Sequence, residues 1–412
     1  MRLSAILLAL TLLASVALAD WNGTIETIDG QTVVKNPEAP AHGTRVLAMN
    51  ELWRRGGEDD EVFFGTIAEF MHDADGNIYL LDKQLCEIQI FGPDGEWLNT
   101  IGERGSGPGQ FMNAADMFWA PNGEIGVVQA WPGKVVMLTP DGNPGTTFKL
   151  PYREGHGFQS VSQGDRQGDH VVLNGSAWVT EGDRQFQHAY LKSYAMDGTE
   201  NAGYLDLKYE IKPGNSEFIE ENWINFRRRW DVAPDGRVAA ADGFKDYRIH
   251  VWNADGSLDR IIERPRYQAV KRTDEEKERF QLIYDAQTSW KRGSTFKVND
   301  LHNSVQQLFF RQDGSLWVQS SAQRWRSPAG QYTSFDVYDT QGRFQWVMTL
   351  DADADPVQDS LFLAGDRAYV VTDALSARMA RLSKSGETDL DSEAEPVNII
   401  SFEFPLPLEG TP

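Results

Sequence analysis

Short apolar runs rich in β-branched and aromatic residues recur along the chain, and turn residues separate them. One unit begins with Phe70 and Met71, passes through the turn Asp75-Gly76 to an apolar segment at 78–82, and continues through 88–91 to a Pro-Asp-Gly turn at 93–95. Asp-Gly between apolar runs is a strong hairpin signal, because glycine tolerates the positive φ that such turns require. The pattern predicts antiparallel strands joined by tight turns.

This unit is repeated along the chain. It returns in clear form around Gly123, Gly236 and Gly314, and in weaker form over 158–198 and 361–386. Gly76 and Gly123 are 47 residues apart, about the length of one four-stranded propeller blade. Helices do not alternate with the strands, which disfavours a parallel sheet. The six units predict an all-β fold, a six-bladed β-propeller formed by a single domain over residues 20–412.

A second internal match indicates how the ring closes. Residues 52–70 parallel residues 100–117, which combine the outer strand of one blade with the inner strand of the next. We therefore expect residues near Val46–Trp53 to form the outer strand of the last blade, so that an N-terminal strand closes the ring. The C-terminal segment 398–404 is an alternative for the same position, and the sequence does not decide between them.

One insertion interrupts the strand rhythm at 265–296. Thr273 and Glu276 have the spacing of a helix capping box, and Phe280, Ile283 and Tyr284 follow at helical intervals. This pattern predicts a short helix near 273–288. It could cover a blade edge or a channel mouth, or serve as a lid that controls access of a substrate.

The connector Gly102–Phe111, with its Gly-Ser-Gly-Pro-Gly-Gln-Phe ending, resembles the linker between NHL-type repeats. The strand pair 78–82 and 88–91 also resembles that repeat. As a whole the chain is similar to exported bacterial six-bladed β-propeller proteins. The resemblance implies this fold and an extracytoplasmic location, and it implies no single reaction.

The charge of the chain narrows the range of partners. There are 39 Lys and Arg residues against 61 Asp and Glu residues, a formal net charge of −22. Nucleic-acid binding requires cationic side chains that replace phosphate counterions, and anionic lipid attracts basic segments. We therefore expect no nucleic-acid partner and no adsorption to anionic membranes.

Residues 1–19 have the features of a secretory signal peptide. Arg2 precedes an apolar stretch from Ala5 to Ala17, and Ala17-Leu18-Ala19 fits the cleavage pattern. Asp20 follows instead of the cysteine of a lipoprotein. The sequence thus predicts a periplasmic or secreted protein, not inserted in the membrane after cleavage, and we expect a monomer.

Polar residues recur at the start of the strands expected to line the central channel. Seven residues before the turn glycines lie Glu69, Asp116, Arg229 and Gln307, and Asp359 falls near the corresponding place in the last unit. Such a ring is either the polar wall of a water-filled channel or a site for a cation or small ligand. The carboxylates of Glu69 and Asp116 are hard ligands that suit calcium or magnesium, whereas Arg229 favours an anionic group. His302 precedes an inner strand and is a further candidate at the channel mouth.

Two functions are compatible with these observations. The first is an extracytoplasmic binding protein whose channel mouth and loops hold a protein, peptide or glycan, since no recognised catalytic motif is present. The alternative is a metal-dependent hydrolase of the six-bladed lactonase or esterase kind, in which a calcium ion held by Glu69, Asp116 and Gln307 would polarise a carbonyl and activate water.

Overall fold

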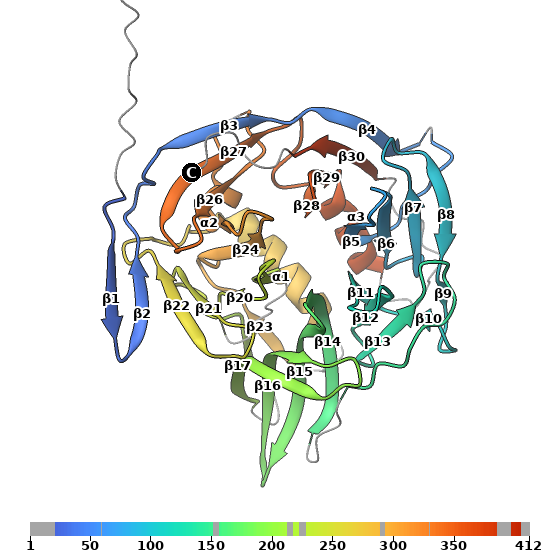
Figure 1. Ribbon diagram of the computed structural model, residues 1–412, viewed down its shortest axis with the longest axis horizontal. Helices are drawn as coiled ribbons and strands as arrows, with labels where there is room; N and C mark the ends of the chain where they lie inside the picture. Colours follow the sequence, from blue (N-terminus) through green and yellow to red (C-terminus); the bar gives the residue numbers. More distant parts are fainter. Residues whose placement is uncertain are drawn as a thin grey trace, which may run out of the picture.

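In the computed structural model of the 412-residue chain, the described residues are 21–58, 60–150, 156–211, 217–221, 228–288, 293–328, 330–384 and 397–404. The predicted signal peptide, 1–19, lies outside them. Six of the sheets formed by the described strands are arranged around a central axis (Figure 1), which confirms the predicted six-bladed β-propeller. We number the blades in chain order from the sheet that contains β5.

In each blade the first strand is innermost and later strands follow outward in antiparallel order. Blade 1 consists of β5 (Ile67–His72), β6 (Ile78–Asp82), β7 (Glu87–Phe91) and β8 (Trp97–Ile101). Blade 2 consists of β11 (Ala114–Trp119), β12 (Ile125–Gln129) and β13 (Lys134–Leu138). Blade 3 has the longest strands, namely β14 (His156–Gln167), β15 (His170–Glu181), β16 (Arg184–Tyr194) and β17 (Glu200–Ile211).

The remaining blades contain strands from distant parts of the chain. Blade 4 is built from β19 (Trp230–Val232), β20 (Val238–Ala240), β21 (Arg248–Trp252) and β22 (Leu258–Glu263). Blade 5 is built from β24 (Val305–Phe310), β25 (Leu316–Ser320), β26 (Thr333–Tyr338) and β27 (Phe344–Asp351). Blade 6 is built from β28 (Ser360–Ala364), β29 (Arg367–Val371), β30 (Asn398–Glu403) and β4 (Glu51–Gly56).

Two short parallel pairs lie outside the blades. They are formed by β9 (Glu103–Arg104) with β10 (Gln110–Phe111), and by β18 (Glu217–Ile219) with β23 (Thr295–Lys297). The first pair lies in the glycine-rich segment 102–111, which connects β8 of blade 1 to β11 of blade 2.

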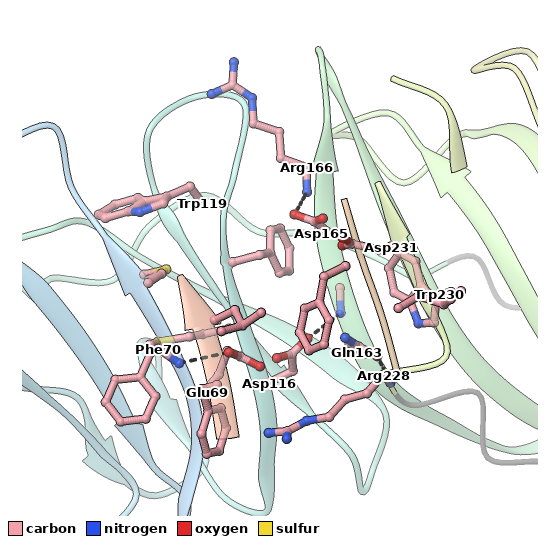
Figure 2. A pocket seen from close by; sticks show the side chains of 18 of the residues that line it. Glu69, Phe70, Asp116, Trp119, Gln163, Asp165, Arg166, Arg228, Trp230 and Asp231 are labelled. Carbon is pink, nitrogen blue, oxygen red and sulfur yellow. Dashed lines mark hydrogen bonds between the residues drawn. The ribbon is translucent and has the colours of Figure 1, made fainter. Parts of the chain in front are cut away.

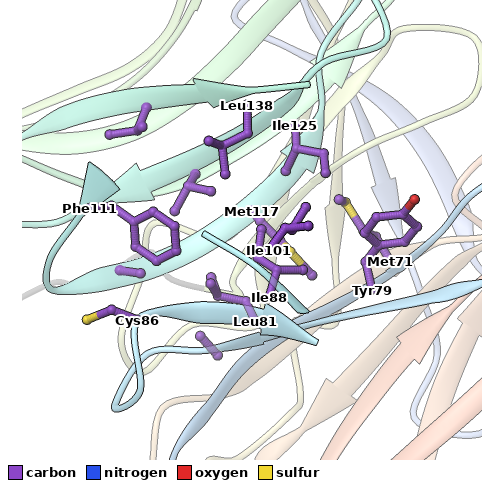
Figure 3. Close-up of a cluster of buried hydrophobic side chains, with 14 of the residues drawn as sticks. Met71, Tyr79, Leu81, Cys86, Ile88, Ile101, Phe111, Met117, Ile125 and Leu138 are labelled. Carbon is purple, nitrogen blue, oxygen red and sulfur yellow. The ribbon is translucent and has the colours of Figure 1, made fainter. Parts of the chain in front are cut away.

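The apolar residues of each blade pack against those of the next. Figure 3 shows the cluster between blades 1 and 2, where Leu81, Ile88 and Phe111 meet Ile125 and Leu138. The other five neighbouring pairs have corresponding clusters. Alternation along the strands sends one set of side chains to each neighbouring blade, so both faces of each sheet are covered. Cys86 lies in the first cluster and is buried.

The ring is closed by the N-terminal segment. Strand β4 pairs antiparallel with β30, with Arg54 opposite Ile400, and is the outer strand of blade 6. Both candidate segments therefore belong to this blade, β30 as its third strand and β4 as its fourth. The closing strand lies slightly later than 46–53, because β3 (Thr44–Ala48) instead pairs parallel with β27 of blade 5.

An N-terminal hairpin extends this wrapping to a third blade. It consists of β1 (Thr24–Ile28) and β2 (Gln31–Lys35), and β2 pairs parallel with β22 on the outside of blade 4. The hairpin, β3 and β4 thus follow the outer rim across three blades (Figure 1). Blades 4 and 5 each have four strands without this N-terminal segment, whereas blade 6 reaches four strands only with β4.

The predicted helix is present as α1 (Asp274–Thr288). The backbone N–H of Thr273 donates to Glu276 Oε2 (2.7 Å), and the N–H of Glu276 donates to Thr273 Oγ1 (3.2 Å), so the capping box forms. Two further helices, α2 (Ser321–Trp325) and α3 (Ala374–Lys384), follow strands of blades 5 and 6. In Figure 1, α1 crosses the centre of the ring.

Candidate functional site

The inner strands of all six blades surround a channel that contains two connected cavities. The inner cavity, of about 260 Å³, is lined by residues from β5, β11, β14, β19, β24 and β28. The outer cavity, of about 500 Å³, is lined by the ends of β14, β19, β24 and β28 and the turns that follow them. The two cavities share five lining residues, Asp165, Arg166, Asp231, Phe309 and Leu363. The cavities therefore meet at these residues.

Helix α1 and the outer cavity lie at opposite mouths. Glu276 of α1 contacts His302, which precedes the start of β24. The outer cavity instead borders Arg311 and Gln312, which follow the end of the same strand. A ligand can therefore approach the outer cavity from the mouth that α1 does not cover.

A β-bulge occurs at the same place in four inner strands. The register shifts lie between Ile67 and Glu69, Ala114 and Asp116, Val161 and Gln163, and Val305 and Gln307. The residues that follow these bulges are Glu69, Asp116, Gln163 and Gln307, which we call row one. A bulge redirects the side chain that follows it, and the first three members of row one line the inner cavity.

Row one also connects neighbouring blades. Asp116 Oδ2 accepts a hydrogen bond from the N–H of Gly164 in blade 3 (2.9 Å). Gln163 Oε1 accepts one from the N–H of Arg228, just before blade 4 (2.8 Å). These contacts give Asp116 and Gln163 a structural role in joining the inner strands. Glu69 accepts a hydrogen bond from the N–H of Phe70 (3.0 Å), and in Figure 2 Glu69 and Asp116 point toward one another.

Two residues further along each inner strand, a second row lines the inner cavity. Row two consists of Met71, Phe118, Asp165, Asp231, Phe309 and Leu363. Its two aspartates come from the adjacent blades 3 and 4, and Figure 2 shows them on the same side of the cavity. The other four members are apolar, so row two has one acidic wall and one apolar wall.

Burial disfavours the charged forms of both aspartates. Asp165 lies deep in the channel, and this desolvation raises the pKa of its carboxyl to about 7, with the charge of Glu69 adding to the rise. Desolvation also raises the pKa of Asp231 well above its usual value, and the charge of Asp165 raises it further. Opposing these effects, the N–H of Arg166 donates to Asp165 (2.7 Å) and the N–H of Phe310 donates to Asp231.

Aromatic and cationic groups complete the inner cavity. Phe70, Trp119, Trp230 and Phe362 are among its lining residues. The guanidinium of Arg228 lies 4.2 Å from the centre of the Phe362 ring and below Asp116 in Figure 2. Ammonium groups are attracted to aromatic faces, so these walls suit a cationic group with attached carbon.

Of the residues selected from the sequence, Glu69 and Asp116 line the inner cavity, and Arg229 does not. Arg228 lines the cavity in its place. The positive φ of Arg228, 62°, breaks the regular alternation of side chains just before β19, so Arg228 and not Arg229 faces the channel. Arg229 is buried and donates to the carbonyl of Gly243. Burial lowers the pKa of its guanidinium to about 10, against the opposing effects of Asp242, Tyr209 and Tyr284.

Gln307 and Asp359 are also absent from the lining of the cavities. Gln307 is half-buried, and its Oε1 accepts no hydrogen bond. Asp359 accepts hydrogen bonds from the N–H groups of Asp355 (2.8 Å) and Asp373 (2.9 Å), so its carboxylate holds the loops at the start of blade 6.

His302 is buried at the base of α1, with 1% of its surface exposed. Its Nδ1 accepts a hydrogen bond from Arg272 Nε (3.3 Å), and its Nε2 lies 3.2 Å from Glu276 Oε2. The ring also stacks on Trp325 at 4.4 Å. Desolvation lowers the pKa of His302 to about 4, so the neutral imidazole packs α1 against blade 5 and does not face the channel.

Asp165 and Asp231 were not among the residues selected from the sequence. Counting back from the turn glycines selects three members of row one, Glu69, Asp116 and Gln307, whereas these aspartates lie in row two. Strand alternation was the available signal in blade 3, where Asp165 lies two positions after Gln163 and therefore on the same face of the strand.

The carboxylates of Glu69 and Asp116 alone do not complete a calcium cage. Calcium takes six to eight oxygen ligands. Among the residues that the structure describes, no three His, Cys, Asp or Glu side chains are grouped so as to hold a metal ion. The Glu69–Asp116 pair lacks a third such ligand there, and we derive no step through a metal.

Comparison with known proteins supports the fold. A family model described as a 6-bladed β-propeller matches residues 59–163. No curated protein matches the chain in sequence. Among the residues described, no helix is both long and apolar enough to cross a membrane.

Several solved structures resemble the chain at low identity. A DUF4221-family protein from Bacteroides vulgatus has 11% identity and a TM-score of 0.46, with 86% of this chain and 97% of that chain covered. Regucalcin from Agrobacterium tumefaciens, described as calcium-binding, has 11% identity and a TM-score of 0.43, with 88% and 97% covered. A gluconolactonase from Xanthomonas campestris has 9% identity and a TM-score of 0.41, with 82% and 87% covered. No residue role is transferred from them.

Proposed function

We propose that the chain is an exported binding protein that holds the positively charged group of a small ligand, or of a peptide end, between Asp165 and Asp231. The observation that carries this proposal is a pair of channel carboxyls without a cationic partner. Neither forms an ion pair with any residue that the structure describes, and both have a raised pKa. A bound cation would offset their repulsion and would favour their charged forms.

The shape of the cavity supports a small ligand group. At about 260 Å³ the inner cavity is near the lower end of the range for small-molecule sites, roughly 300–1,000 Å³. A folded protein cannot enter it, whereas an amine or the amino end of a peptide can. The apolar wall of row two would contact the carbon atoms next to the charged group.

Calorimetric titration with leucinamide, a cation at neutral pH, tests this function. Its neutral counterpart is 4-methylpentanamide, which has the same branched skeleton without the amino group. We expect leucinamide to bind, the neutral amide to bind at least tenfold more weakly, and Asp231→Asn to weaken leucinamide binding by a similar factor. Equal binding of the two compounds would contradict the proposal.

A matched variant controls for the loss of one negative charge. Asp235 lies four residues after Asp231, is exposed, and is paired with Arg237 at 2.8 Å instead of lining a cavity. Asp235→Asn should leave leucinamide binding unchanged. Calcium belongs in the same titration series, because the hydrolase alternative requires a bound metal; tight calcium binding that Glu69→Ala and Asp116→Ala abolish would favour that alternative.

A further inference from the structure

A further cavity lies at the outer side of the ring, away from the channel. It has a volume of about 870 Å³ and is lined by β7 and β8 of blade 1, by the end of β4 and by residues 60–63 (Figure 1). None of its lining residues also lines the inner or the outer cavity. We call it the rim groove, and the residues that matter below are Phe63, Glu87, Gln89, Trp97 and Thr100.

One face of blade 1 supplies a polar row to the rim groove. The strand register pairs Gln89 with Thr100 and Phe91 with Trp97. Glu87 lies two residues before Gln89, so all these side chains share one face of the sheet. Trp97 Nε1 donates to Thr100 Oγ1 (3.3 Å), and Gln89 Nε2 donates to Glu87 Oε1 (3.0 Å). The opposite face of blade 1 is apolar and packs on blade 2, so the polar row is a distinct feature of this face.

Two aromatic rings at the rim groove are accessible from solvent. Trp97 is 49% exposed and Phe63 is 46% exposed. Gln89 Nε2 donates to the carbonyl of Phe63 (3.1 Å), which holds the segment that carries this ring against the polar row. Glu87 and Thr100 are partly exposed as well. A ligand in the groove can therefore contact both rings and the polar groups between them.

The polar row offers hydrogen-bond acceptors to such a ligand. Burial raises the pKa of the Glu87 carboxyl, against the hydrogen bond from Gln89, and the charge of Asp82 raises it further. A hydroxyl group donating to Glu87 would offset this lost hydration. The hydroxyl of Thr100 can accept as well as donate, so the row suits a ligand that carries several hydroxyl groups.

The ionic groups at the β4 side of the groove are already engaged within the protein. Arg55 Nε donates to the carbonyl of Gly95 (2.8 Å), and its guanidinium lies 3.7 Å from Asp60. Asp60 also accepts hydrogen bonds from the N–H groups of Gly56 (2.9 Å) and Val62 (3.1 Å). This arrangement favours a neutral ligand over one that depends on an ion pair with these groups.

We propose that the rim groove binds a neutral oligosaccharide. The apolar C–H faces of its sugar rings would lie on Trp97 and Phe63. Its hydroxyl groups would donate to Glu87 and Thr100. From Glu87 to Phe91, the residue opposite Trp97, the row follows four residues of strand, about 13 Å, so more than one sugar unit lies along it. This site is separate from the channel and does not rest on the function proposed for it.

Calorimetric titration of the full mature protein with maltohexaose, cellohexaose and chitohexaose, three neutral oligosaccharides, tests the inference. We expect at least one of them to bind. Trp97→Ala should weaken that binding about tenfold or more, because tryptophan is among the costliest residues to truncate in a binding surface. Trp97→Phe keeps an aromatic face and should lose less. Trp131→Ala is the matched control, since Trp131 is equally exposed (49%) and lies outside the groove, and it should leave binding unchanged.

Hexalysine in the same series tests a basic peptide as the alternative ligand, because Glu61 and Glu87 both line the groove. Binding of hexalysine without binding of any oligosaccharide would overturn the saccharide assignment, as would absence of binding by all three oligosaccharides. Oligosaccharide binding that Trp97→Ala leaves unchanged would overturn it too, since the sugar would then lie elsewhere. Asp231→Asn should not alter oligosaccharide binding, so this result and that of the channel titration can fail independently.

Discussion

Asp165 raises the pKa of Asp231 within the channel, although the two residues belong to different blades. The ring alone brings them together, since 66 residues separate them in the chain. Each also accepts a backbone N–H at the inner strands, Asp165 from Arg166 and Asp231 from Phe310. Their placement is therefore fixed by the fold, and the charge of Asp165 disfavours the charged form of Asp231.

The burial of the Asp165 carboxyl predicts that Asp165→Asn stabilises the protein at high pH. The folded state keeps a proton on Asp165 up to about pH 7, whereas an unfolded aspartate releases it near pH 4. The stability of the unaltered protein therefore falls as pH rises through this window, and an asparagine avoids the loss. We expect the variant to melt about 1 °C higher at pH 8, the shift that roughly 1 kcal/mol produces in a chain of this length.

At pH 4 both forms are uncharged at this position, so the two melting temperatures should agree. Calorimetry at both pH values checks the prediction. A variant that is equally or less stable than the unaltered protein at pH 8 would show that Asp165 is not strained.

The N-terminal strands differ in what they contribute to the ring. Removing residues 20–57 takes away β4 and leaves β30 as an uncovered edge of a three-stranded blade 6. We expect this shortened chain to lose its cooperative unfolding transition. Removing only 20–30 takes away β1, whose residues are all exposed and which pairs only with β2; this chain should unfold cooperatively.

Circular dichroism during thermal unfolding measures both shortened chains. If the chain without 20–57 melts like the full protein, strand β4 is dispensable and the closure of the ring lies elsewhere.

A buried ion pair anchors the region of α1. Glu220 receives hydrogen bonds from Arg272 Nη1 (2.6 Å) and Nη2 (2.7 Å), and the side chains of the pair are 3% and 1% exposed. Tyr284 of α1 donates to Glu220 as well (3.0 Å). Glu220→Ala leaves the arginine buried without its partner and should cost about 3–5 kcal/mol of stability.

Glu221 is the matched control for this pair. It binds Lys245 at 2.6 Å, but both side chains are about a third or more exposed, so Glu221→Ala should cost at most about 1 kcal/mol. Urea denaturation of the two variants gives the comparison. Equal losses would mean that the buried pair contributes no more than a surface pair.

The sequence was sufficient for the fold because repeats and turn glycines carry that information locally. The turns at Gly76, Gly123, Gly236 and Gly314 all have positive φ, as the hairpin signal requires. The sequence did not predict which blade β3 joins, because the apolar stretch around Val46 is compatible with pairing to either blade 5 or blade 6. Which blade it joins depends on the path around the rim.

The residues of the channel site were harder to predict from the sequence than the fold, for two physical reasons. Arg228, with its positive φ, shifts the strand phase in blade 4, so counting from Gly236 selects Arg229. The raised pKa values of Asp165 and Asp231 come from burial and from neighbouring charges, Glu69 for Asp165 and Asp165 for Asp231, which only the assembled ring brings together. Glu69 and Asp116 could be found because their blades repeat most clearly.

The most direct test of the channel site is the titration of its carboxyl groups by carbon-13 NMR, with Asp165→Asn and Asp231→Asn used for assignment. We predict one aspartate that titrates near pH 7 in the unaltered protein, a lower pKa for Asp231 once Asp165 is replaced, and a downward shift of the titration when leucinamide is added. Titration of both carboxyls below pH 5, with no response to leucinamide, would contradict the proposed cation site.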